Sequence, residues 1–201
     1  MRLHPGLVVR VNNEVVAAVS SENFNILSVR IHGDVLSPEI AVLDVTGGYY
    51  GGPEETKHLI WVNDHELSEL DEVEIQFQDI PASSHVGKTI KEIYPQEEAS
   101  VDEHPLEIAE LAGALREEPR LRNGFDLHVR VSDTDPQVFS VRDPDHSFFV
   151  SIMWDWKSID SAKFSVSSTT IQNIAEQKSG TNYLRRRLRV SQSVCVRIVS
   201  Q

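Results

Sequence analysis

The stretch LSVRIHGD, residues 27–34, alternates apolar with polar side chains, and a similar stretch, FFVSIMWD, occupies residues 148–155. Such alternation, rich in β-branched residues, predicts a β-strand with one buried face. A shift of 121 residues aligns the two stretches and pairs Val29 with Val150. The two stretches therefore predict that the chain contains one structural unit twice.

The similarity continues on both sides of these stretches. Shifts of 120 to 122 residues align five alternating segments in the same order. Conserved order and spacing over five segments favour an internal duplication over a chance match between two β-rich stretches. Besides the opening pair, the aligned segments are Leu7–Val11 with Leu127–Val131, Val15–Val19 with Gln137–Val141, Leu43 and Val45 with Phe164 and Val166, and Leu67, Val73, Ile75 and Phe77 with Leu188, Val194, Val196 and Ile198.

The predicted fold is α+β and predominantly β, with two tandem related antiparallel lobes, sandwich- or barrel-like, joined by a helical connector. Its parts are an acidic first lobe at residues 1–80, an acidic connector at 81–121 and a second lobe at 122–201. The second lobe carries one inserted helix, which Thr170 can cap and Gly180 can end.

The connector contains the strongest helical pattern of the chain. Pro105 is a favoured first helical residue, and Pro119 stops the pattern. The residues between them form one apolar side, which we expect to be buried against a lobe. On this reading Leu111 is a buried anchor of the connector.

Charge is distributed unevenly along the chain. Residues 1–80 carry a net charge of −10, residues 81–121 carry −5 and residues 122–201 carry +3, within a total of −12. An acidic surface attracts basic proteins over long distances, so the sequence favours a basic protein partner and argues against nucleic acid. The run Arg185–Arg187 is expected to form a solvated face or intramolecular ion pairs.

Three observations indicate a cytoplasmic protein without a membrane segment. The single cysteine, Cys195, has no partner for an internal disulfide, and no apolar run reaches the roughly 18 residues that a membrane helix needs. The first residues lack the continuous apolar stretch of a secretory signal. No cofactor motif occurs, and no residue is assigned a catalytic role.

A glycine-rich stretch, TGGYYGGPEETKH at residues 46–58, stands apart from the alternating segments. Glycine allows close backbone approach, and Tyr49 and Tyr50 offer rigid amphipathic contact area. The stretch is predicted to be a partner-binding loop with an acidic rim. The alternative is a turn whose tyrosines lie on their own lobe. The rim residues are Glu54, Glu55, Asp64 and Glu66.

One group of residues has weak metal-ligand character. His32, Asp34, His58 and His65, with Asp64 nearby, combine imidazole and carboxylate ligands that suit zinc. His58 and His65 are seven residues apart in a predicted strand, so they would lie on opposite faces unless the strand bends. Surface or hydrogen-bonded histidines are therefore favoured, and no metal is predicted.

Three classes of function remain open from the residues alone. The favoured one is a non-enzymatic protein-interaction module, for example an immunity- or antitoxin-like inhibitor that binds a basic partner. The first alternative is a small-molecule or metal-binding module with a site between the lobes. The second is a carboxylate-dependent enzyme that uses Asp34 and Asp64.

Overall fold

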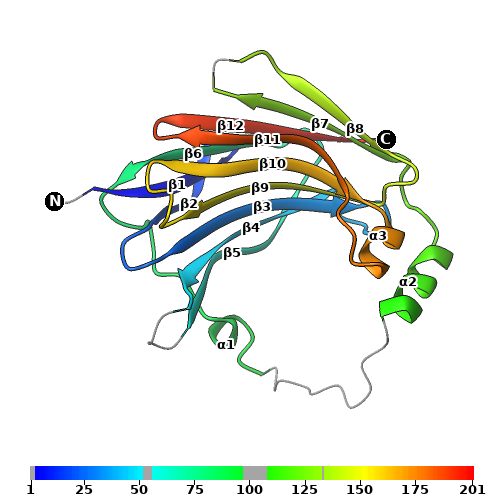
Figure 1. The fold of residues 1–201 in the computed structure, drawn as a ribbon, viewed down its shortest axis with the longest axis horizontal. Helices are drawn as coiled ribbons and strands as arrows, with labels where there is room; N and C mark the ends of the chain where they lie inside the picture. Colours follow the sequence, from blue (N-terminus) through cyan, green and yellow to red (C-terminus); the bar gives the residue numbers. More distant parts are fainter. Residues whose placement is uncertain (1–2, 52–55, 97–107, 133) are drawn as a thin grey trace.

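The computed structural model describes residues 3–51, 56–96, 108–132 and 134–201. Two six-stranded antiparallel sheets pack face to face as a sandwich, and short helices lie at their margins (Figure 1). The predicted α+β, predominantly β fold class is confirmed, and the sheets do not close into a barrel.

Both sheets consist only of antiparallel pairs. The first sheet has the order β2-β1-β6-β12-β7-β8, with bounds Glu14–Ser20, His4–Val11, Glu72–Ile80, Gln192–Ser200, Gly124–Val131 and Gln137–Arg142. The second sheet has the order β11-β10-β9-β3-β4-β5, with bounds Thr181–Arg189, Ser161–Thr169, Ser147–Asp155, Ile26–Asp34, Ala41–Tyr49 and Lys57–Leu67.

Three helices complete the described residues: α1 (Ile90–Ile93), α2 (Ile108–Glu117) and α3 (Ile171–Ala175). The predicted helix of the second half is confirmed as α3, and the Thr170 hydroxyl accepts a hydrogen bond from the Asn173 backbone N–H. Helices α2 and α3 lie together at one end of the sandwich, and α1 lies beside β5 (Figure 1). Within the described ranges, no helix is long and apolar enough to cross a membrane.

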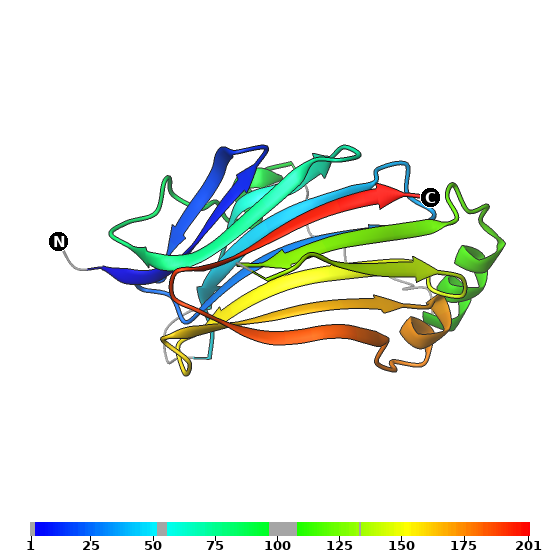
Figure 2. The ribbon, with the colours of Figure 1, turned by 90° about the horizontal axis from the view of Figure 1, so that it is seen from above.

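The strand order of each sheet is symmetric about its centre. The first sheet has β6 and β12 in the middle, and the second has β3 and β9 there. Three neighbouring strands of each sheet come from residues 1–80 and three from residues 122–201. Each half therefore contributes to both sheets, and the halves meet along two strand pairs, of which β6 and β12 are seen side by side in Figure 2.

The register of the two central pairs agrees with the shift that aligns the halves in sequence. Arg30 lies opposite Ser151 between β3 and β9, and Glu74 lies opposite Cys195 between β6 and β12. The members of each pair are 121 residues apart. Equivalent residues of two symmetry-related strands face each other only where the two-fold axis passes. These two pairs thus mark where an approximate two-fold axis crosses the sheets.

The core lies between the sheets and is built from alternate residues of each strand. On β9, Phe148, Val150, Ile152 and Trp154 are buried, and the residues between them face away from the core. The ring of Phe148 meets that of Phe125 from the first sheet edge to face, with centroids 4.7 Å apart. Contacts of this kind hold the two sheets together.

The connector helix differs from the expectation at one residue. Leu111 is 47% exposed, so the prediction that it is a buried anchor is wrong, whereas the neighbouring Ala112 is buried. Helix α2 packs on α3, and the Arg116 guanidinium donates a hydrogen bond to the Gln172 side chain. The expected helix start at Pro105 lies outside the described residues.

The adjacent residues Phe148 and Phe149 provide a direct test of the register of β9. Phe148→Ala should lower the free energy of unfolding by about 3–5 kcal/mol, because the substitution leaves a cavity between the sheets. Phe149→Ala should cost much less, because this ring lies on the outer face. Urea unfolding of both variants measures the difference, and equal losses would contradict the assigned register.

Candidate functional site

An aromatic pocket lies at one end of the second sheet, where three segments distant in sequence meet. The segments are the β2–β3 loop, the end of β4 and the β9–β10 turn. The pocket has a volume of about 480 Å³, which is in the size range of ligand-binding clefts. Its lining consists of Phe24, Asn25, Tyr49, Tyr50, Gly51, Trp156 and Lys157.

Asn25 joins the three segments through hydrogen bonds. Its side-chain amide donates to the Tyr50 carbonyl oxygen at 2.6 Å and accepts from the Tyr50 backbone N–H at 3.0 Å. Its backbone carbonyl accepts from the Trp156 N–H at 3.0 Å, and its own N–H donates to the Gly48 carbonyl at 2.9 Å. Asn25 therefore holds the backbones of Tyr50 and Trp156 in a defined position.

Tyr50 is held at its hydroxyl end as well. The hydroxyl forms a hydrogen bond with His58 Nδ1 on the neighbouring strand β5. Partial burial raises the pKa of Tyr50, so its phenol is neutral at physiological pH. A neutral ring with both ends fixed is suited to contact and hydrogen bonding.

Glycine is required beside the tyrosines because two backbones come close together. A Cβ atom at Gly48 would lie 1.9 Å from the carbonyl oxygen of Lys57. Any other residue at this position would push β5 away from β4. Strand packing therefore explains the glycine at position 48, and Tyr49 and Tyr50 follow it where β4 ends.

Trp156 contributes the most exposed ring of the pocket, at 56% exposure. It follows β9, whose alternation buries the nearby Trp154. Trp156 is not among the site residues predicted from the sequence. One feature of the sequence could have indicated it. Trp156 comes directly after the alternating stretch that ends at Asp155, in a turn that also contains Lys157.

Of the four predicted acidic rim residues, the structure describes Asp64 and Glu66, both on β5. Glu54 and Glu55 lie outside the described residues. The Asp64 backbone N–H donates a hydrogen bond to the Asp44 carboxylate. Glu66 lies opposite Val42 on β4, seven residues before Tyr49, which corresponds to about 23 Å of extended strand.

Three of the four weak metal candidates make other contacts, namely His32, Asp34 and His58. His32 Nδ1 lies 3.6 Å from an Asp44 carboxylate oxygen, and its ring stacks on Phe149. Asp34 accepts hydrogen bonds from the backbone of the turn that follows β3. His58 bonds Tyr50, and His65 lies further along β5. In the part of the chain that the structure describes, no three histidine, cysteine or acidic side chains are grouped to bind a metal.

Comparisons of the chain with protein-family models, with curated proteins and with solved structures found no match.

Substitution of Asn25 should loosen the aromatic pocket. Asn25→Ala removes two hydrogen bonds and should lower the free energy of unfolding by about 1–3 kcal/mol. Faster amide hydrogen exchange at Tyr50 should accompany the loss. Asn182→Ala, at an exposed asparagine on β11, is the matched control and should change neither quantity. Unchanged exchange in the Asn25 variant would show that other contacts hold the loop.

Proposed function

We propose that this protein is a non-enzymatic protein-interaction module that binds its partner through the aromatic pocket. The observation that carries the proposal is the exposed ring of Trp156 beside Tyr49 and Tyr50 around a preformed hollow. Tryptophan and tyrosine dominate the binding energy of protein interfaces when a partner covers them. The pocket offers large, rigid contact area, and Asn25 holds its three segments together before any partner arrives.

Net charge supports a basic partner. The chain carries −12 overall, with −10 in residues 1–80, which contain two of the three segments that form the pocket. Long-range attraction of this kind accelerates association more than it tightens the final complex. Lys157 in the pocket lining is the local exception, and it favours a carboxylate or carbonyl group on the partner at that point.

We also infer that the two halves of the chain derive from an internal duplication. The constant shift in sequence, the symmetric strand orders and the 121-residue spacing at both central pairs support this inference. Tyr49 and Trp156 come from different halves and do not occupy equivalent positions. The aromatic pocket is thus a feature that distinguishes the halves, as expected for a function acquired after duplication.

Capture experiments with the tagged full chain, in cells that produce it, test the proposed surface. Trp156→Ala and Tyr50→Ala should each weaken the captured complex by about 2 kcal/mol, or roughly thirtyfold in Kd, mainly through faster dissociation. Val138→Ala removes a similarly exposed apolar side chain from β8 in the other sheet and should have no effect.

Salt dependence tests the charge argument separately. Association should slow as ionic strength rises, while the effect of Trp156→Ala on dissociation should stay constant. Wild-type kinetics in both aromatic variants would reject the pocket as the partner surface. A complex whose association rate is insensitive to salt would reject the basic partner.

A further inference from the structure

The outer face of the second sheet carries a row of polar residues that crosses all six strands. Arg30 on β3 lies opposite Asp44 on β4 and Ser151 on β9, and Ser165 on β10 lies opposite Ser151 and Arg185. At the other end, the Asp64 backbone N–H donates to Asp44 Oδ1 at 3.0 Å. The row therefore runs from two carboxylates on β5 and β4 to a guanidinium on β11.

Two hollows lie on this face at equivalent positions of the two halves. The acidic pocket, about 330 Å³, is lined by Arg30, Asp44 and Asp64, with His58 at its side. The basic pocket, about 490 Å³, is lined by Ser151, Met153, Lys163, Ser165, Arg185 and Arg187. Residues 30 and 151, 44 and 165, and 64 and 185 are each 121 positions apart. The second half thus has serine and arginine where the first has two aspartates.

The cations of the basic pocket are only partly neutralised by the protein. Lys163 Nζ lies 2.8 Å from an Asp155 oxygen, and this interaction lowers the pKa of Asp155. Arg187 donates to the Ser158 and Ser161 hydroxyls at 3.3 and 3.2 Å, which fix its guanidinium without cancelling its charge. Among the described residues, Arg185 and Arg187 form no salt bridge. Arg185, Arg186 and Arg187 are all exposed, so of the two expected arrangements the structure shows the solvated face.

The register places like charges next to each other. Lys163 lies directly opposite Arg187 in the β10–β11 ladder, and Arg185 follows two residues away on the same face. Like charges directly opposite in an antiparallel pair destabilise it, and β11 is an edge strand with no neighbour beyond it. A bound dianion would remove this repulsion. The small side chains of Ser151 and Ser165 leave space for such a group and supply hydroxyl donors, with 3.5 Å between their oxygens.

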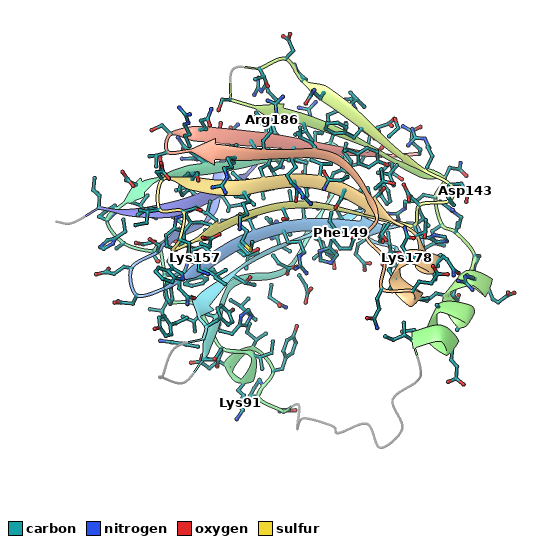
Figure 3. The ribbon with its side chains drawn as sticks, in the orientation of Figure 1. Lys91, Asp143, Phe149, Lys157, Lys178 and Arg186 are labelled. Atoms are coloured by element: carbon teal, nitrogen blue, oxygen red, sulfur yellow. The ribbon has the colours of Figure 1, made fainter. Side chains whose placement is uncertain are left out.

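We propose that the basic pocket binds the phosphate or sulfate group of a small organic ligand. Arg185 and Arg187 pair with the anion, Lys163 supplies the third positive charge, and the Ser165 hydroxyl donates a hydrogen bond. The volume of the pocket exceeds the needs of a bare tetrahedral ion, so the organic part of the ligand packs on Met153. The basic and aromatic pockets share no lining residue, so this inference does not depend on the proposed partner surface. Figure 3 labels three residues around this face: Arg186 on β11, Phe149 on β9 and Lys157 in the β9–β10 turn.

Titrations of the full chain followed by amide chemical shifts test this site. The probes are inorganic phosphate, inorganic sulfate, glucose 6-phosphate and glucose 6-sulfate, with chloride at matched ionic strength and glucose as references. Saturable shifts at residues 151, 163, 165, 185 and 187 should occur with all four anions and with neither reference. The two monoesters should bind more tightly than the free ions. The monoester that binds more tightly shows whether the pocket prefers a phosphate or a sulfate group.

Charge-removing variants then assign the contacts. Arg185→Gln and Arg187→Gln should each raise the Kd at least tenfold, whereas Arg130→Gln removes the same charge from β7 in the other sheet and should leave the Kd unchanged. Spectra of the free variants show that each is folded. Shifts that do not saturate, or an equal loss in Arg130→Gln, would overturn the site. Monoesters that bind no more tightly than the free ions would overturn the assignment of an organic ligand.

Discussion

The antiparallel pairing of β3 with β9 is the interaction on which the rest of the structure depends. It joins the two halves into one six-stranded sheet, with Arg30 opposite Ser151 at its centre. Because side chains on a strand alternate between faces, this register places Val29 and Val150 in the core. A slip by one residue would move the apolar set of one half to solvent, so burial of the core stabilises the register strongly.

A symmetric backbone leaves the outward residues free to differ. The core of each half requires apolar residues only at alternate positions, and Leu43 and Phe164 both satisfy that requirement at equivalent places. Their outward neighbours, Asp44 and Ser165, are under no such constraint. The opposite charges of the two pockets on this face follow from that freedom, because the sheet tolerates either sign where solvent or a ligand provides the counter-charge.

The aromatic pocket arises in a different way, at strand ends rather than on a sheet face. Tyr50 and Trp156 are more than a hundred residues apart in sequence, and Asn25 links their backbones. Strand ends are free of the alternating pattern, so large aromatic side chains can remain partly exposed there without disturbing the core. The sandwich provides a rigid base for these segments, as is common for binding sites on β-sheet scaffolds.

Local patterns in the sequence determined the strands, the helix that Thr170 caps, and the spacing between the halves, because alternation and capping depend on neighbouring residues. The tyrosine pair was also visible in the sequence. Only the tertiary structure decided that the halves share both sheets, that Trp156 lies beside Tyr50, and that Glu66 lies several residues along the β4–β5 ladder from Tyr49. It also decided that Ala112, not Leu111, is buried. These outcomes depend on which distant segments pair and pack. Burial of the whole core decides that pairing, and a short stretch of sequence does not contain the information.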